Sequence, residues 1–226
     1  MGAQALRCSH GGTRSRVPPL GGLYAAVEAY YSRKLSRHGA TPRGVDWESA
    51  EAQALRFAQL MKLCEPARAF SLNDIGCGYG ALLGFLAKRH AGAQIDYLGI
   101  DLSPAMIRRA RAAWRRRHRV SFAVATRGPR VADYSVASGI FNVKLDQPAP
   151  LWERFIATTL ADMHRTSRKG FAVNFLLPPA PGRTSPPELY RTASKPWIGY
   201  CREALGASVE FIGDYGLDEF TLLVRW

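Results

Sequence analysis

Short apolar runs alternate with amphipathic segments from Phe70 onward, a pattern that predicts alternating strands and helices. The predicted strands are Phe70–Ile75, Gln94–Ile100, Val120–Ala125, Ser135–Phe141, Gly170–Leu176, Ser208–Ile212 and Glu219–Val224. The predicted helices are Ala81–Arg89, a helix that opens at Ser103-Pro104, Pro150–His164 and a helix around Leu189–Leu205. Strands that alternate with helices favour an α/β fold, in which a parallel sheet has helices on both faces.

The N-terminal part of the chain follows a different pattern. Residues 1–22 are rich in Gly, Pro, Ser and Arg and lack periodicity, which predicts a flexible extension. Apolar residues at helical spacing predict one helix over Leu23–Leu35 and a second from near Asp46 to Leu63. We therefore expect a single domain at residues 23–226, in which residues 23–65 form a helical cap.

Length and composition fit a cytoplasmic globular protein. The chain has 226 residues, 47% hydrophobic and 22% charged, which suits one domain with a sizeable core. No apolar run approaches the roughly 18 residues of a membrane span, and the N-terminus lacks a signal-peptide core. The four cysteines (Cys8, Cys64, Cys77 and Cys201) are scattered without metal-ligand spacing, which predicts free thiols and no metal site.

The net charge of +13 raises the question of an acidic partner such as nucleic acid. Most of the excess lies in one tract, Arg108–Arg119, which falls on the helix after the second strand. Arginine is a good helix former, and cations are favoured at a helix C-terminus. We therefore interpret the tract as a solvated helix face and expect no nucleic-acid partner.

A glycine loop follows the first strand, in the run Ser71–Gly80. Glycine allows a sharp turn and a close approach of the backbone to a ligand, and the following helix start offers free N–H groups. The spacing of Gly76, Gly78 and Ala81 also satisfies the dinucleotide-binding consensus. The glycines alone therefore do not identify the ligand.

Two acidic residues at neighbouring strand ends narrow the choice of ligand. Asp74, just before the loop, would repel a pyrophosphate and hold an ammonium group. Asp101 ends the second strand about 20 residues after the loop, where a carboxylate typically grips ribose hydroxyls. A ligand with a ribose, a free amine and no phosphate fits both acids, and S-adenosylmethionine (SAM) is such a molecule.

Three motifs together resemble the class I SAM-dependent methyltransferases: Asp74–Gly80, Gly99–Ile107 and Asp214–Val224. The resemblance extends over about Trp47–Trp226 and implies a Rossmann-like, seven-stranded, mostly parallel sheet that ends in an antiparallel hairpin. It also implies SAM contacts from Asp74, Gly76, Cys77, Gly78, Gly80, Asp101, Leu102, Met106, Thr126 and Ser138.

The cofactor's carboxylate also needs a partner. Gln53, Arg56 and Arg43 lie on or near the second cap helix, and arginine pairs with carboxylates through two parallel hydrogen bonds. We predict Arg56 for this contact, with a solvent-facing arginine as the alternative.

The reacting groups are predicted at the end of the fourth strand and in the cap. In the family fold the sulfonium lies there, so Asn142, Phe141 and the cap tyrosine Tyr31 are the candidate catalytic residues. The alternatives are a turn residue for Asn142 and a core residue for Phe141. Related amine-methylating nucleic-acid enzymes have Asn/Asp-Pro-Pro-aromatic here, and the absence of both prolines counts against a base as the acceptor.

A general base is not evident, since His164, His38 and Asp146 each have a structural explanation. A site without a base suits amine, thiolate or carboxylate nucleophiles, which need mainly alignment. The favoured function is methyl transfer to a small molecule, such as a sugar or a natural-product intermediate. The alternatives are cyclisation of SAM to azetidine-2-carboxylate and methylthioadenosine and, less favoured, RNA modification.

Overall fold

The computed structural model describes residues 19–65 and 68–226. Most of the predicted extension at residues 1–22 lies outside these ranges. Helix α1 spans Gly21–His38 and so includes two glycines that were assigned to the extension. Its first turn closes through a hydrogen bond from the Tyr24 N–H to Leu20 O, which needs no side chain at Gly21 or Gly22.

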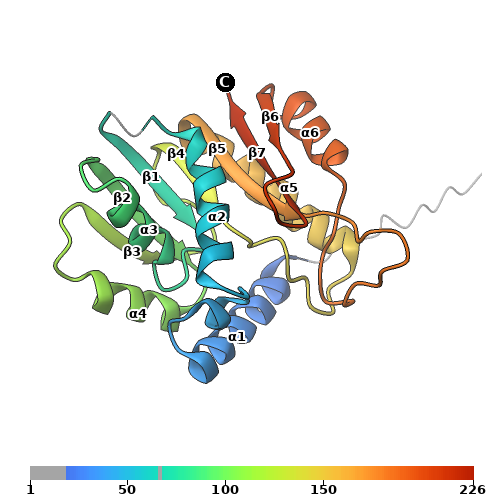
Figure 1. Ribbon diagram of the computed structural model, residues 1–226, viewed down its shortest axis with the longest axis horizontal. Coiled ribbons are helices and arrows are strands. Elements are labelled where there is room, and N and C mark those ends of the chain that lie inside the picture. Colours follow the sequence, from blue (N-terminus) through green and yellow to red (C-terminus); the bar gives the residue numbers. More distant parts are fainter. Residues whose placement is uncertain (1–18, 66–67) are drawn as a thin grey trace, which may run out of the picture.

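Seven strands form one sheet in the order β3-β2-β1-β4-β5-β7-β6 (Figure 1). The strands are β1 (Phe70–Ile75), β2 (Ile95–Asp101), β3 (Val120–Val124), β4 (Ala132–Ala137), β5 (Ser167–Leu176), β6 (Ser208–Ile212) and β7 (Glu219–Arg225). The first five are parallel, and β7 pairs antiparallel with both β5 and β6. The predicted fold class, a mostly parallel sheet with a terminal antiparallel hairpin, is confirmed.

The carboxyl ends of β1, β2 and β4 lie side by side. Ile75 is paired with Ile100 of β2 and with Ala137 of β4. The chain order reverses at β1, because β2 lies on one side of it and β4 on the other. Ligands of open α/β sheets bind at such a reversal point.

β4 ends earlier than the sequence predicts, at Ala137 instead of Phe141. Gly139 has a φ of +72°, which turns the chain out of the strand. Phe141 then enters the core, where its ring stacks on Phe175 with centroids 5.2 Å apart. The prediction that Phe141 faces the reacting centre is therefore wrong, and its alternative, a core position, is right.

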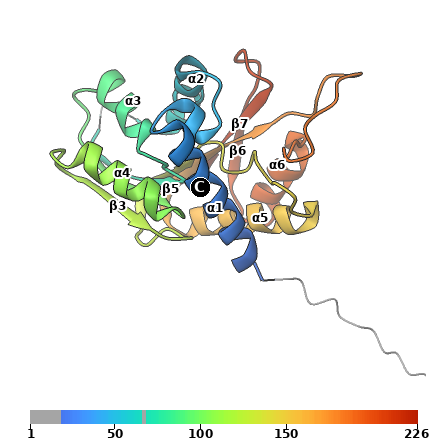
Figure 2. The ribbon, with the colours of Figure 1, turned by 90° about the horizontal axis from the view of Figure 1, so that it is seen from below.

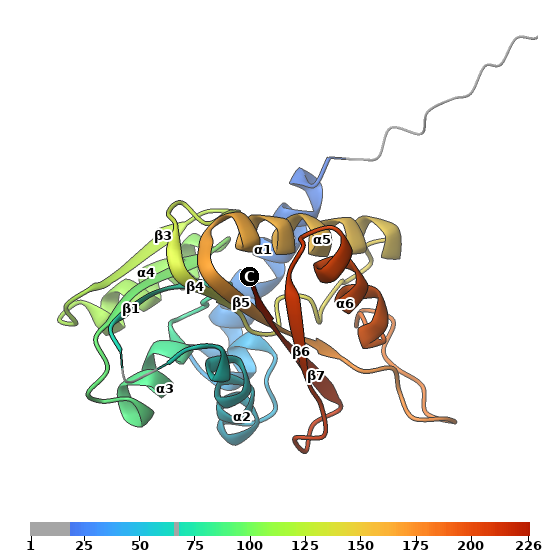
Figure 3. The same cartoon turned by 90° about the horizontal axis from the view of Figure 1, so that it is seen from above.

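Helices cover both faces of the sheet. Figure 3 shows α5 (Ala149–Arg165) and α6 (Ser194–Glu203) on one face, opposite α2 (Ala50–Leu60) and α3 (Ala81–Arg89). The core has two clusters accordingly, and helix α4 (Pro104–Trp114) adds Ile107 and Ala110 to the cluster of α2 and α3. Ser103 caps α4 as predicted, because its Oγ accepts the Met106 N–H at 3.2 Å.

Helix α6 is shorter than predicted and begins at Ser194. The segment before it is extended instead, since Leu189 bridges Val143 and Arg191 bridges Leu176. Backbone pairing with the loop after β4 and with the end of β5 therefore replaces the first turns of the predicted helix.

The cap consists of α1, a short 3-10 helix η1 (Pro42–Val45), α2 and a second 3-10 turn η2 (Met61–Leu63). Figure 2 shows α1 crossing the end of the sheet, with α4 on one side and α5 on the other. Within residues 19–65 and 68–226, no helix combines the length and apolar character needed to cross a membrane.

Candidate active site

The glycine loop forms a tight turn between β1 and α3. Gly76, Gly78 and Gly80 all have positive φ, at +72°, +54° and +86°. The turn is fixed to β2, because the N–H groups of Gly76 and Cys77 donate to Ile100 O at 2.8 and 3.0 Å. A Cβ on Gly76 would lie 2.2 Å from the Ile140 side chain, so only glycine fits there.

Asp101 braces the same loop from the end of β2. Its Oδ2 accepts the Gly78 N–H at 2.9 Å, and its Oδ1 accepts the Ser103 N–H at 2.8 Å. Burial raises the pKa of Asp101, whereas these two N–H groups lower it. The side chain thus joins the glycine loop to the start of α4 and still lines the cavity described next.

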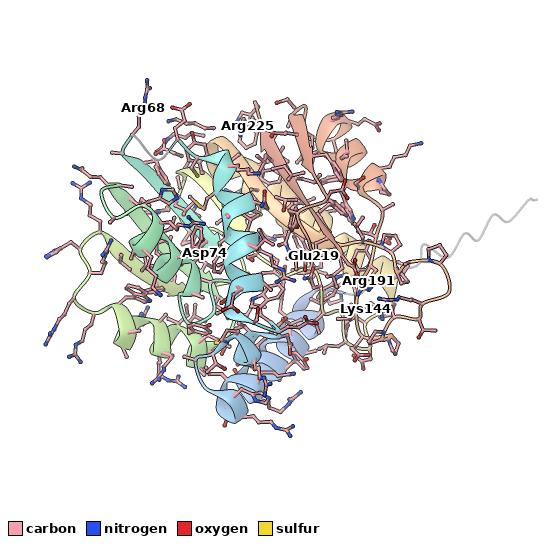
Figure 4. All side chains as sticks on the ribbon, viewed as in Figure 1. Arg68, Asp74, Lys144, Arg191, Glu219 and Arg225 are labelled. Carbon is pink, nitrogen blue, oxygen red and sulfur yellow. The ribbon has the colours of Figure 1, made fainter. Side chains whose placement is uncertain are left out.

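Asp74 is buried at the end of β1, with 2% of its surface exposed (Figure 4). Its Oδ2 accepts the Tyr97 hydroxyl at 2.5 Å. Burial raises the pKa of the Asp74 carboxyl to about 7, although the Tyr97 hydrogen bond opposes this shift. A cationic ligand beside it would restore the charged form.

A cavity that is partly open to solvent lies at these strand ends beneath α1. Ten of the predicted site residues lie on its wall: Tyr31, Asp74, Gly76, Cys77, Gly78, Asp101, Leu102, Met106, Thr126 and Ser138. The structure therefore brings together residues from the cap, the glycine loop and the ends of β2, β3 and β4.

Charge on the cavity wall has one sign. Its carboxylates are Glu28, Asp74 and Asp101, and no Lys, Arg or His is present among the described wall residues. The chain as a whole has a net charge of +13, so the wall is opposite in sign to the molecule. Such a wall fits a cationic ligand and disfavours a pyrophosphate.

Helix α1 contributes a stripe to the cavity that the sequence analysis missed, apart from Tyr31. Tyr24, Val27, Glu28 and Tyr31 follow the i, i+3, i+4, i+7 spacing of one helix face. This spacing was the available signal, but it also fits an ordinary core face. Burial raises the pKa of Tyr31 far above its usual value, so its hydroxyl keeps its proton.

Polar contacts hold α1 over the cavity. Ser32 Oγ lies 2.7 Å from Ser103 Oγ at the start of α4 and donates to Glu28 Oε1 at 2.7 Å. Lys34 Nζ lies 2.6 Å from Asp46 Oδ1 in the loop after η1. The first contact attaches α1 to the start of α4, and the second joins α1 to the loop after η1 within the cap.

Arg56 does not lie on the cavity wall, contrary to prediction. Its Nε and Nη2 donate to Glu219 of β7, at 2.8 Å and 2.5 Å to Oε1. The Trp47 ring covers the guanidinium, whose carbon lies 4.0 Å from the ring centroid. The charge of Arg56 is thus neutralised within the protein, and the predicted pairing with the cofactor's carboxylate is not supported.

Two further predicted residues lie off the wall. Gly80 caps α3 behind the loop, where a Cβ would lie 2.7 Å from Trp114 Nε1. Asn142 is 5% exposed, and its Oδ1 has no hydrogen-bond partner among the described residues. The Asn142 N–H donates to Gly139 O, and its carbonyl accepts the Tyr190 N–H, so its backbone also serves as a turn.

A metal centre finds no support in the described part of the chain. No group of three or more His, Cys, Asp or Glu side chains lies close enough to hold an ion there. The three described cysteines are buried free thiols, in agreement with the prediction, and Cys8 lies outside the described residues.

Comparison with known proteins identifies the family. A family model for a methyltransferase domain matches residues 73–170. Rv1506c of Mycobacterium tuberculosis (strain H37Rv), a protein named as a candidate methyltransferase, is 42% identical over 165 residues. These residues are 73% of this chain and 98% of that protein. The chain belongs to the class I SAM-dependent methyltransferases.

Solved methyltransferase structures share the fold. They include the N-methyltransferase NodS from Bradyrhizobium japonicum WM9 in complex with S-adenosylhomocysteine (SAH), with a TM-score of 0.63 and 17% identity over 88% of this chain and 97% of that one. Magnesium protoporphyrin IX methyltransferase from Synechocystis PCC 6803, with bound SAM, has a TM-score of 0.59 and 15% identity over 90% of this chain and 97% of that one. The 1,6-didemethyltoxoflavin-N1-methyltransferase of Burkholderia thailandensis has a TM-score of 0.60 and 21% identity over 92% of each chain.

Membership in this family makes the protein an enzyme with SAM as its cofactor. The cavity fits that molecule, since SAM has a sulfonium, an ammonium group and no phosphate, and the described wall presents carboxylates without cations. Among the described wall residues, the cofactor's carboxylate then has neutral donors available, such as the side chains of Gln53 and Tyr31.

Proposed function

We propose that this enzyme transfers the methyl group of SAM to a small-molecule acceptor held between the cofactor and the cap. The acceptor is a sugar or a natural-product intermediate without phosphate or carboxylate groups. The observation that supports this proposal is the wall of the cavity, which has three carboxylates and no cation among its described residues. An anionic acceptor would meet like charges there without a counterion.

Three cations on neighbouring segments are engaged within the protein. Arg56 is paired with Glu219. Lys144 Nζ donates to the carbonyls of Leu145 and Gln147, and Arg191 donates to Ser185 Oγ and Leu177 O. Figure 4 labels both side chains in the region of the loops that follow β4 and β5. These cations stabilise their own loops and are not directed at an acceptor.

The proposed cofactor contacts divide along the cavity. Asp101 accepts hydrogen bonds from the ribose hydroxyls, and Thr126 contacts the adenine between Leu102 and Met106. Asp74 faces the ammonium group. The backbone of Gly76, Cys77 and Gly78 approaches the cofactor closely because two of these residues have no side chain.

Tyr31, Ser138 and Asn142 are the proposed polar groups at the transfer end. Tyr31 is a half-buried donor on the wall, and Ser138 Oγ is buried there without a partner among the described residues. Asn142 follows on the same loop with an unpartnered Oδ1, but it lies off the wall and would need a shift of this loop to reach an acceptor. Such groups can orient an acceptor, and the lack of a histidine or lysine base on the described wall favours a nucleophile that needs no deprotonation before attack, such as a neutral amine of the acceptor.

Alignment supplies the rate enhancement in such a site. Bound SAM provides an electrophilic methyl group, and the protein holds the acceptor's lone pair in line with it while excluding water. Positioning of this kind accounts for about 7–11 kcal/mol of the barrier in well-aligned reactions.

Cyclisation of SAM is the second candidate. The same observation favours it, because a wall without a cation leaves the methionine chain free to fold and without a fixed carboxylate partner. The α-amine lone pair would form a bond to the γ-carbon, and the C–S electron pair would stay on sulfur. The products would be azetidine-2-carboxylate and methylthioadenosine.

Mass spectrometry of the purified enzyme with SAM separates the two candidates. With SAM alone we expect no product above the no-enzyme control, and with an acceptor mixture of uncharged sugars, phenols and amines we expect SAH. Methylthioadenosine with SAM alone would replace methyl transfer by cyclisation. Release of SAH only with phosphorylated or carboxylated acceptors would contradict the proposed acceptor class.

A further inference from the structure

A buried chain of hydrogen bonds crosses the molecule next to the cavity. Arg56 of α2 is paired with Glu219 of β7, and Asn174 Nδ2 of β5 donates to Glu219 Oε2 at 2.8 Å. Asn174 Oδ1 accepts the Gly139 N–H at 2.7 Å. Glu219 thus links α2, β7 and β5, and Asn174 extends this link to the loop after β4.

The side chains that form this chain of hydrogen bonds are all buried. Glu219 is 1% exposed, Asn174 is 0% exposed, and Arg56 is buried as well. A buried ion pair typically gives no more stability than apolar residues of the same volume, because both charges lose their hydration. Stability of the fold alone therefore does not account for a charged pair at this position.

This chain of hydrogen bonds holds one end of the cavity in place. Gly139 lies between Ser138 and Ile140, which are both on the wall. On the other side of the pair, the Trp47 ring lies on the Arg56 guanidinium and also lines the cavity. A Cβ on Gly139 would lie 2.2 Å from the Trp47 ring, so the loop and the cap are in close contact there.

We propose that Glu219, through Arg56 and Asn174, positions Trp47 and the Ser138–Ile140 loop for the reaction at the transfer end of the cavity. Glu219 itself does not line the cavity. It acts through its two partners, one on the cap and one on the sheet. The inference rests on the proposed function only in taking this cavity as the site where SAM reacts.

The test compares a variant that removes one charge of the ion pair with a double variant that removes both charges and keeps the volume. Glu219→Gln leaves the buried Arg56 without its counterion, so we expect a large drop in melting temperature. The double variant Arg56→Met/Glu219→Leu removes both charges and should recover most of that drop. Asn174→Leu breaks the link to Gly139 and removes one donor from Glu219, but it keeps both charges of the ion pair. It provides a further variant if the first two fail to fold.

Two ligands then report on the two ends of the cavity. SAH reports on the adenosine and amino-acid contacts, and sinefungin adds an amine at the position of the transferred methyl group. In the double variant and in Asn174→Leu we expect the dissociation constant for SAH to change less than threefold in calorimetry. We expect the affinity for sinefungin to fall at least tenfold.

A purely structural role would not give this pattern. Wild-type affinity for both ligands in a folded double variant would overturn the inference, and so would an equal loss for both. A wild-type enzyme that binds neither SAH nor sinefungin would instead contradict the proposed function, so the two failures are distinguishable.

Discussion

The two walls of the cavity are held together in different ways. The wall of β1, β2 and the glycine loop is fixed by backbone groups, such as the Gly78 N–H on Asp101 and the Gly76 N–H on Ile100 O. The wall of the cap and the loop after β4 is fixed by side chains, through Arg56, Glu219 and Asn174. The Gly78–Asp101 bond of the first wall joins residues 23 positions apart, whereas the Arg56–Glu219 pair of the second joins residues 163 positions apart.

This difference suggests a division of labour between the walls. The first wall includes Asp74, Asp101 and the glycine loop, which are the proposed contacts of the cofactor, so it suits cofactor binding. Side-chain pairs can be exchanged without refolding the sheet, so the second wall suits the acceptor. The variants below test whether cofactor affinity depends on the first wall and reaction geometry on the second.

The largest effect is expected from the first wall. Asp101→Ala removes the proposed ribose contact and also the acceptor of the Gly78 and Ser103 N–H groups, so SAH affinity should fall more than 100-fold in calorimetry. Asp96→Ala on the same strand is the matched control, because Asp96 is largely exposed and pairs with Arg130 outside the cavity. An unchanged affinity in Asp101→Ala would mean that the ribose is placed wrongly.

The second wall is tested by two glycines with similar backbone angles. Gly139 has a φ of +72° and would bring a Cβ against Trp47, whereas Gly216 has a φ of +84° and open space around it. Alanine at a positive φ costs about 1–2 kcal/mol at either site. We expect Gly216→Ala to lose only that amount in urea unfolding, and Gly139→Ala to lose at least about 2 kcal/mol more. Equal losses would show that Trp47 does not pack on this loop.

The same contrast explains what could be predicted from sequence. The motif from Asp74 to Gly80 and the acid at Asp101 are contiguous signals, and β1, the cap of α4 and the terminal hairpin were predicted correctly. Arg56 and Phe141 were predicted wrongly because their partners, Glu219 and Phe175, lie far along the chain. The early end of β4 depends on one glycine, which in a sequence does not differ from a glycine within a strand.

Titration of Asp74 gives a smaller effect that is specific to the first wall. The folded pKa of about 7 lies above the unfolded value of about 3.9, so the folded protein binds more protons between these values. The free energy of unfolding of the ligand-free enzyme should therefore decrease as the pH rises from 4 to 7, by on the order of a few kcal/mol. Asp101, whose pKa is also raised, adds to the same trend.

Asp74→Asn isolates this contribution, since an amide keeps an acceptor for the Tyr97 hydroxyl. Urea unfolding at several pH values should show a shallower decrease in this variant than in the wild type and in an Asp96→Asn control. SAM, as a cation, should bind more tightly as Asp74 loses its proton, so its affinity should rise from pH 6 to pH 8. A wild-type slope in Asp74→Asn would assign the pH dependence to other groups.

The smallest effect is expected outside both walls, in the arginine tract. The side chains of Arg115, Arg116 and Arg117 are exposed after α4 and form no salt bridge among the described residues. Replacing all three by glutamine should change stability by less than about 0.5 kcal/mol each and leave SAH affinity unchanged. Arg130→Gln is the contrasting control, because Arg130 donates hydrogen bonds to Asn73, Leu72 and Asp96. Its replacement should therefore destabilise the protein. If the wild type binds RNA with a steep salt dependence and the triple variant does not, the tract is a nucleic-acid surface and the solvated-face interpretation is wrong.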